Sequence, residues 1–138
     1  MLTDRLFRVP SYRVAEARAE AAAPSYVYEF GWHSPIAPNE AGLPLGAAHS
    51  IELPFVWDTL DNPDCLRLTG PQPPRSLAAE LHRRWVEFAR TGELPGGVPY
   101  GAEDRSVLVF GHEGGAETGL VADPRAAERK LWEGVDFG

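Results

Sequence analysis

The sequence has a single cysteine, no excess of positive charge and no long apolar run. One cysteine, Cys65, excludes an internal disulfide, because a disulfide needs two thiols. The formal net charge of −7 argues against a nucleic acid or an anionic membrane surface as a partner. No apolar stretch approaches the length of a membrane span, so we expect no transmembrane helix. The N-terminus lacks the pattern of a signal peptide, which leaves the location open and favours a cytoplasmic one.

The sequence also lacks the usual patterns of metal sites. The aspartates of residues 58–64 come without the glycine and the terminal glutamate of a calcium loop. His112 has no second histidine at the spacing of zinc ligands. We therefore expect no metal and no other cofactor. No internal repeat is visible.

The composition is that of an ordinary globular protein, with 43% hydrophobic and 24% charged residues in 138. We treat residues 1–138 as one domain, or a piece of one, of the α/β class. A helix followed by a strand is typical of a parallel sheet, and such a strand needs a preceding strand to pair with. The first ten residues are too short to supply it, so the pattern calls for a partner strand that this sequence lacks. The pattern predicts an extended lead-in Met1–Pro10, helix Tyr12–Ala23 capped by Ser11, strand Tyr26–Phe30, helix Leu77–Thr91 capped by Ser76 and ended by Gly92, strands Ser106–Phe110 and Glu117–Ala122, and a last helix from Asp123 to Trp132.

One stretch, GLPLGAAHSIELPFVW, places a histidine between a glycine-containing bend and an apolar run. Gly46 permits backbone angles closed to other residues, so the bend would hold His49 at a turn. A histidine has an unperturbed pKa near neutrality, which makes His49 a candidate general base. Glu52 follows three residues later, and one helical turn would place it on the side of His49. Most single histidines in apolar surroundings are only hydrogen-bonded, so the pattern alone leaves both interpretations open.

The segment GAAHSIELPFVW resembles the histidine segment of the type B carboxylesterases, the family that includes para-nitrobenzyl esterases and cholinesterases. Three further stretches agree with the family in the same order: LTDRLFRVPSYRVAEARA, YVYEFGWHSP and LHRRWVEFARTGELP. The resemblance covers nearly the whole chain but only the C-terminal quarter or so of the family's length. It therefore implies the last sheet strands and packing helices of an α/β-hydrolase fold, which would be incomplete by itself.

The resemblance implies the catalytic histidine for His49 and a supporting position near the site for Glu52. It also suggests Trp32, Phe55 and Trp57 as a candidate wall of the ester pocket. Catalytic groups in these hydrolases follow the order serine, acid, histidine, so the serine, the acid and the oxyanion loop should lie upstream of this chain. None of the six serines has the Gly-x-Ser-x-Gly pattern of the nucleophile. The chain alone should therefore be inactive.

Three hypotheses follow. In the first, the chain is the C-terminal part of a serine carboxylesterase, and its partners are an ester substrate and the N-terminal remainder of the domain. In the second, it is a non-catalytic remnant or interaction module derived from that fold. The third, a small hydrolase that uses Ser50 or Cys65, is disfavoured because neither residue has a base suitably placed in the sequence.

Overall fold

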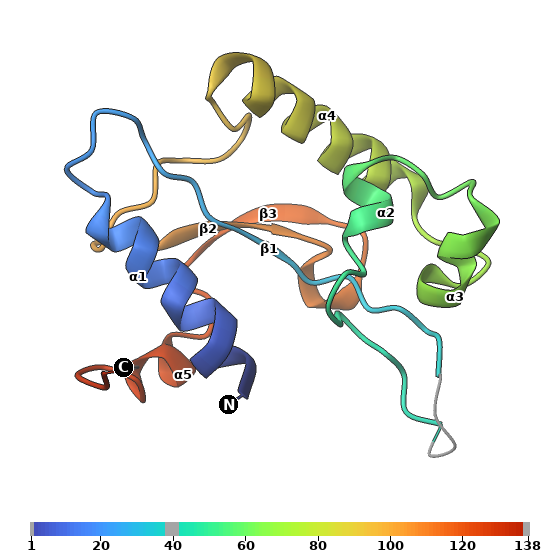
Figure 1. Cartoon of the computed structure of the whole chain (residues 1–138), viewed down its shortest axis with the longest axis horizontal. Coiled ribbons are helices and arrows are strands. Elements are labelled where there is room, and N and C mark those ends of the chain that lie inside the picture. The colour runs from blue at the N-terminus through green and yellow to red at the C-terminus, as the bar shows by residue number, and fades with distance from the viewer. Residues whose placement is uncertain (1, 38–41, 137–138) are drawn as a thin grey trace. The chain divides into compact units, whose positions relative to one another are not determined.

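The structure is a computed structural model, and it describes residues 2–37 and 42–136. Figure 1 shows how the strands and helices of these residues are arranged. The elements in chain order are the π-helix η1 (Asp4–Arg8), α1 (Val9–Ala17), β1 (Tyr28–Phe30), α2 (Leu53–Val56), the 3₁₀-helix η2 (Pro63–Cys65), α3 (Leu66–Thr69), α4 (Arg75–Thr91), β2 (Ser106–Phe110), the 3₁₀-helix η3 (His112–Gly114), β3 (Thr118–Ala122) and α5 (Ala126–Lys130).

The chain forms two compact units. The first unit comprises Met1–Val27, Gly97–Leu108 and Leu120–Gly138, and the second comprises Tyr28–Gly96 and Val109–Gly119. Helices α1 and α5 belong to the first unit, whereas α2, α3 and α4 belong to the second. The segment that contains His49 therefore lies wholly in the second unit.

The strands form one sheet in the order β1-β2-β3. Val27 O accepts from Leu108 N at 3.1 Å and Gly31 N donates to Phe110 O at 2.7 Å, so β1 and β2 run in the same direction. Gly111 N bonds to Glu117 O at 2.8 Å and Asp123 N to Arg105 O at 2.9 Å, so β2 and β3 are antiparallel. The first strand thus has a parallel neighbour within this chain, but it is β2, which follows β1, and not the preceding strand that the sequence pattern called for.

The first helix begins and ends earlier than predicted. Residues of the expected lead-in Met1–Pro10 form η1 and the start of α1, and Ser11 lies inside α1, where its hydroxyl donates to Phe7 O at 2.7 Å. Val9 N bonds to Asp4 O, a wider turn than that of an α-helix, and Pro10, which has no N–H to donate, follows directly in the first turn of α1. The helix ends at Ala17 although Ala19 and Ala21–Ala23 have high helix propensity, because those alanines are exposed and bury nothing.

Helix α4 matches the predicted helix and ends at Gly92, which has φ +77°. Ser76 does not cap it, because the helix already begins at Arg75 after Pro74. The helical spacing of Leu77, Leu81, Trp85 and Phe88 predicts one apolar stripe that faces the core. Only half of this stripe is buried: Leu77 is 1% exposed and Leu81 0%, whereas Trp85 and Phe88 are each 38% exposed. Helix α2 packs against α4, as Figure 1 shows.

The C-terminal elements follow the prediction more closely. Strand β2 has the predicted bounds and β3 begins one residue later than expected. Helix α5 is shorter than predicted, because Asp123 does not cap it. The Asp123 carboxylate instead accepts two hydrogen bonds from Arg129, each 2.9 Å long. Gly134, with φ +74°, lies beyond the end of α5.

Candidate active site around His49

The loop before His49 is held by a bridge between two distant backbone segments. Ser34 N donates to Gly46 O at 3.1 Å and Gly46 N to Ser34 O at 3.2 Å. Gly46 has φ +59°, the left-handed conformation that the sequence predicted for the bend. The Ser34 side chain is fully buried and donates to Leu68 O, while it accepts from Ile36 N at 3.2 Å. These bonds fix the chain three residues before the histidine.

The segment after His49 is held by a short turn and a buried anchor. Ile51 N donates to Ala48 O and Leu53 N to Ser50 O, each at 3.3 Å. Ile51 is 0% exposed, so its side chain fixes the turn to the core of the second unit. Helix α2 follows directly. His49 is therefore held on a turn, as the sequence predicted.

The imidazole of His49 is exposed, and in the described part of the chain it makes no hydrogen bond, ion pair or ring contact. A general base in a hydrolase is normally oriented by an acid and faces a nucleophile. Within residues 2–37 and 42–136 neither group lies against His49. The geometry thus provides an accessible, pre-positioned imidazole but no complete catalytic set.

Glu52 is half-buried one turn after His49, at the N-terminal end of α2. No hydrogen bond or ion pair joins it to His49 among the described residues. Its carboxylate acts instead on Tyr28: burial raises the pKa of the Tyr28 hydroxyl, and the negative charge of Glu52 raises it further. The supporting role of Glu52 at the catalytic histidine stays a prediction.

The three candidate wall residues have different environments. Trp32 and Phe55 are buried, at 7% and 0% exposed, and their rings pack 5.1 Å apart. Phe55 also packs against Phe30 at 5.0 Å, so these rings form the core beneath the His49 turn. Trp57, by contrast, is 67% exposed. The structure brings Trp32 and Phe55 together and leaves Trp57 apart from that pair.

An apolar groove of about 440 Å³ lies between α2 and α4, and Trp57 and Glu52 line it together with Tyr28, Leu53, Val56, His82, Trp85, Val86 and Ala89. The sequence pattern did not indicate this groove. His82 flanks the apolar stripe of α4, which favours a structural role, and its Nδ1 lies 2.8 Å from Val56 O, a hydrogen bond that requires the proton on Nδ1. The available signal was the aromatic end of the predicted stripe on α4, which stays exposed.

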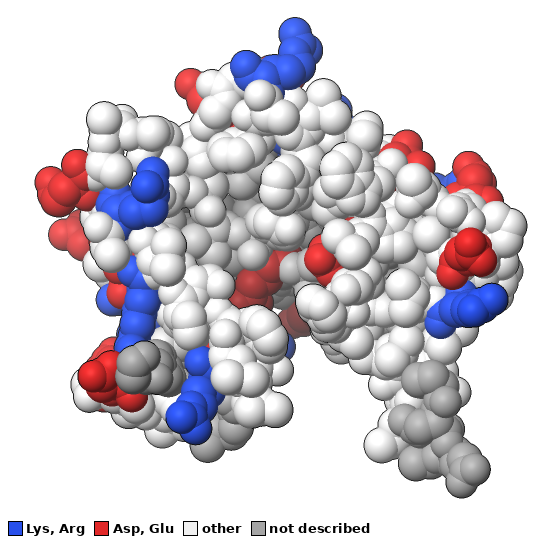
Figure 2. All heavy atoms as spheres, in the orientation of Figure 1, with Lys and Arg blue, Asp and Glu red and all other residues white. Residues whose placement is uncertain are grey.

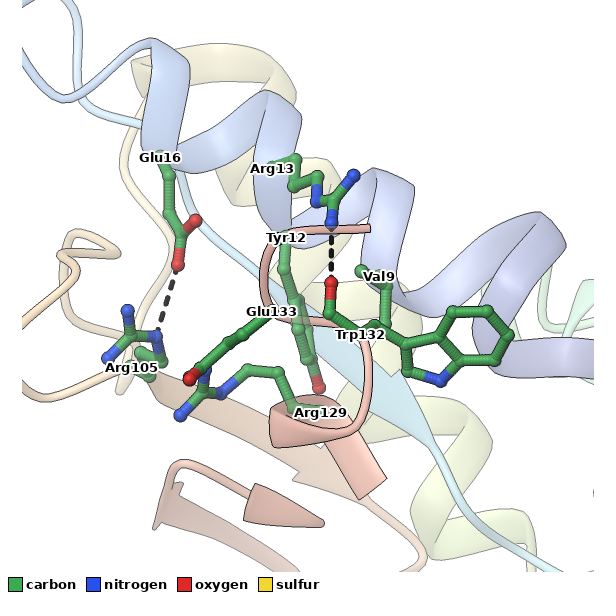
Figure 3. Close-up of a pocket in the computed structure, with 9 residues that line it drawn as sticks. Val9, Tyr12, Arg13, Glu16, Arg105, Arg129, Trp132 and Glu133 are labelled. Carbon is green, nitrogen blue, oxygen red and sulfur yellow. Dashed lines mark hydrogen bonds and ion pairs between the residues drawn. The ribbon is translucent and has the colours of Figure 1, made fainter. Parts of the chain in front are cut away.

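A second cavity, of about 320 Å³, lies within the first unit and is shown in Figure 3. Its walls are Tyr12, three arginines, two glutamates and several residues around α5. Charged residues of a helix usually lie on its solvated face, but Arg13 and Glu16 of α1 line this cavity. Figure 3 shows Arg13 directed at Trp132 and Glu16 directed at Arg105.

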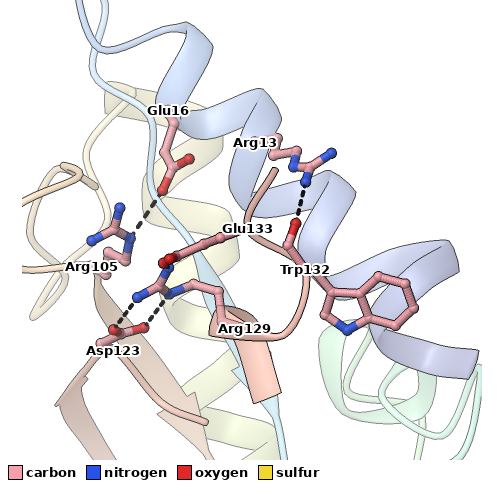
Figure 4. Close-up of polar contacts among 7 residues, drawn as sticks. All are labelled: Arg13, Glu16, Arg105, Asp123, Arg129, Trp132 and Glu133. Atoms are coloured by element: carbon pink, nitrogen blue, oxygen red, sulfur yellow. Dashed lines mark hydrogen bonds and ion pairs between the residues drawn. The ribbon is translucent and has the colours of Figure 1, made fainter. Parts of the chain in front are cut away.

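The charges at this cavity neutralise one another, as Figure 4 shows. Arg105 Nε lies 3.1 Å from Glu16 Oε1, and Arg129 binds both oxygens of Asp123 and also Glu133, at 2.8 Å. Arg13 donates to Trp132 O at 2.8 Å. Hydrogen bonds from Arg129 hold the pKa of Asp123 below its ordinary value. We interpret this cluster as a network that joins α1 to the C-terminal segment.

Charge does not mark a further site on the described surface that Figure 2 shows. On the face in Figure 2, acidic and basic side chains lie in small separate groups among uncharged residues. Among the described residues, no three His, Cys, Asp or Glu side chains are grouped so as to hold a metal ion. None of the helices in residues 2–37 and 42–136 is long and apolar enough to cross a membrane. Cys65 is a half-buried free thiol in η2.

Comparison with known proteins decides the family. The model of the carboxylesterase family matches residues 1–106, which include the His49 turn. The chain belongs to the carboxylesterase family. It is 35% identical over 134 residues to phenmedipham hydrolase of Pseudarthrobacter oxydans, across 88% of this chain and 25% of that protein. It is 30% identical to para-nitrobenzyl esterase of Bacillus subtilis, across 94% of this chain and 26% of that protein.

Solved structures agree with the sequence comparison. A PNB esterase structure superposes with a TM-score of 0.75 at 28% identity, over 94% of this chain and 26% of the esterase. A thermophilic PNB esterase gives the same TM-score and coverage. The expected fold class is thus confirmed: the chain is part of an α/β-hydrolase fold. It spans about a quarter of the length of the curated relatives it matches.

Proposed function

We propose that this chain is the C-terminal, histidine-bearing segment of a serine carboxylesterase and that His49 is its catalytic base. The supporting observation is that the family match spans the turn on which His49 is held and exposed. In this role His49 would take the proton of a serine hydroxyl during acylation and return it to the leaving alcohol. The nucleophile, the triad acid and the oxyanion donors would come from outside this chain.

The local structure suits that role. A general base must be held still while its ring stays accessible, because a small misplacement of the base lowers the rate strongly. The Ser34–Gly46 bridge fixes the chain before His49, and the buried Ile51 fixes the turn after it. Glu52 would act as a positioning residue near the base, and buried Trp32 and Phe55 would support the floor of the site rather than contact the ester.

The test is a chimera in which this chain replaces the matched quarter of the Bacillus subtilis para-nitrobenzyl esterase. We expect the chimera to hydrolyse a para-nitrophenyl ester and His49→Ala to lower kcat by roughly a thousandfold or more. His112→Ala is the matched control, because His112 is also an exposed histidine of the second unit. Turnover that survives His49→Ala in a folded chimera would refute the proposal.

A second measurement addresses the native form. An antibody against Lys130–Gly138 would report the size of the species in the source cells. A species several times larger than 15.1 kDa would support a full esterase that carries this segment. A species of 15.1 kDa with no bound hydrolase partner would favour the alternative, a non-catalytic module derived from the fold.

A further inference from the structure

Strand β1 has one open edge in the sheet of described residues. Val27 O and Gly31 N bond to β2, at 3.1 and 2.7 Å. Alternate residues of a strand direct their backbone groups to opposite sides, so the N–H and C=O of Tyr28 and Phe30 point away from β2. Since the sheet order is β1-β2-β3, no described strand lies on that side. An open edge of this kind is a template for another strand.

The apolar groove between α2 and α4 presents large side chains that a folded protein normally covers. Trp57 is 67% exposed, Leu53 45%, Val86 43% and Trp85 38%. Glu52 and His82 are the acidic and basic side chains in its lining, and His82 is already bonded to Val56 O. Large apolar side chains that are exposed side by side, rather than singly, are typical of an interaction site.

Tyr28 makes the open edge and the groove one continuous surface. Its backbone belongs to the free side of β1, while its ring lines the groove and packs edge-on against Trp85, with ring centroids 5.9 Å apart. If a partner adds a strand along β1, the partner's residues on either side of that strand would therefore lie over the groove. All of these residues belong to the second unit.

The comparisons indicate what covers this surface. The fold superposes on PNB esterases with a TM-score of 0.75 but accounts for only 26% of their chains. An α/β sheet buries its strands between neighbours and its helices against one another, so a quarter of such a domain must present cut surfaces to the rest. An open strand edge beside a groove lined by tryptophans has the character of such a surface.

We propose that the open edge of β1 and the groove between α2 and α4 form a docking surface for the remainder of a carboxylesterase domain. That partner adds a strand along Tyr28–Phe30 and places apolar side chains between Trp57 and Trp85. The inference rests on the function proposed above, since it takes the partner to be the part of the hydrolase that carries the nucleophile. A second copy of this chain is the competing occupant.

The test co-expresses the full 138-residue chain with the part of Bacillus subtilis para-nitrobenzyl esterase outside its matched quarter. The esterase's own two pieces, co-expressed in the same way, show that this part is competent to bind. We expect the chain to co-purify with it. Val86→Lys should weaken binding roughly tenfold or more, because a buried unpaired charge is costly. Leu66→Lys is the matched control, since Leu66 is 43% exposed like Val86 but lies on α3, away from the groove.

Hydrogen exchange tests the strand edge separately. In the chain alone the amides of Tyr28 and Phe30 should exchange fast, whereas the Gly31 amide is protected by its bond to Phe110 O. In the complex the first two should become protected and Gly31 should change little. Unchanged exchange at Tyr28 and Phe30, or equal effects of Val86→Lys and Leu66→Lys, would overturn the proposal.

The outcomes also separate this inference from the proposed function. If the chain binds through the groove but the complex has no turnover that depends on His49, the docking surface stands and the catalytic role falls. If the covalent chimera is active through His49 while the groove variants bind normally, the reverse holds. A chain that forms a stable dimer lost in Val86→Lys would assign the surface to a second copy and would also overturn the proposal.

Discussion

Gly111 offers the sharpest test of the packing that supports the candidate site. It ends β2 with φ +75°, next to the segment of Trp32. A Cβ added at Gly111 would lie 2.6 Å from Trp32 Cβ and 2.7 Å from Trp32 Cα. Backbone and Cβ atoms cannot rotate out of the way, so Gly111→Ala forces the ends of β1 and β2 apart.

The expected magnitude follows from two separate costs. A left-handed conformation costs a residue with a Cβ roughly 1–2 kcal/mol. Overpacking of a closely packed site adds about 1–3 kcal/mol. We therefore expect Gly111→Ala to lower the free energy of unfolding by about 2–5 kcal/mol, a large fraction of the roughly 5–15 kcal/mol of an ordinary domain.

Gly92 is the matched control. Its φ of +77° is nearly that of Gly111, but nothing lies within 4 Å of the added Cβ. Gly92→Ala should therefore cost only the conformational part, about 1–2 kcal/mol. Urea unfolding of the full chain and its variants, followed by circular dichroism and tryptophan fluorescence, measures both values. Equal losses for the two variants would contradict the close approach of Gly111 and Trp32.

Two further predictions concern titratable groups of the first unit. Hydrogen bonds from Arg129 hold the pKa of Asp123 below its ordinary value of 3.8. This carboxylate therefore stabilises the fold above that pH, and the contribution is lost as the pH falls through the lowered pKa. Asp123→Asn should remove this step from an acid-unfolding profile, and a profile identical to that of the parent chain would refute the assignment. Burial raises the pKa of Tyr100 to about 12, and its hydroxyl has no hydrogen-bond partner among the described residues. Tyr100→Phe should therefore leave the free energy of unfolding unchanged or raise it by up to about 1 kcal/mol. An ultraviolet pH titration of this variant should lack the tyrosine transition that the parent chain shows near pH 12.

The sequence predicted best those elements whose signals are local. The run Ser106–Phe110 is apolar and bounded by a charged residue and a glycine, and it forms β2 with those bounds. Gly92 ends α4 because the left-handed conformation favours glycine whatever surrounds it. Gly46 adopts a positive φ before His49 for the same reason, so the position of the candidate base on a turn was predictable.

Caps were less predictable, because a serine before an apolar run has several ways to bond. Ser11 donates to Phe7 O inside a helix that began upstream, and α4 starts at Arg75 before Ser76. The charged network of the first unit was not predictable at all. Glu16 and Arg105 are 89 residues apart, and nothing in the local pattern of either one indicates the other.

The exposed half of the stripe on α4 carries the most information about function. Periodicity alone predicted a fully core-facing stripe from Leu77 to Phe88, and a helix with that pattern normally buries all of it. The buried half, Leu77 and Leu81, contributes to the core of the second unit, whereas Trp85 and Phe88 stay half-exposed. The apolar stripe of α4 is therefore longer than the part of it that the described residues cover.

The exposed residues Trp85 and Phe88 are not among those that hold the His49 turn, and that matters for mechanism. The bridge from Ser34 to Gly46, the anchor Ile51 and the buried Phe55 hold the turn, and none of these residues lines the groove. A partner that docks on the groove would meet a base already held in place. Because a pre-positioned base loses little freedom on assembly, docking would complete the catalytic set without refolding the segment that carries His49.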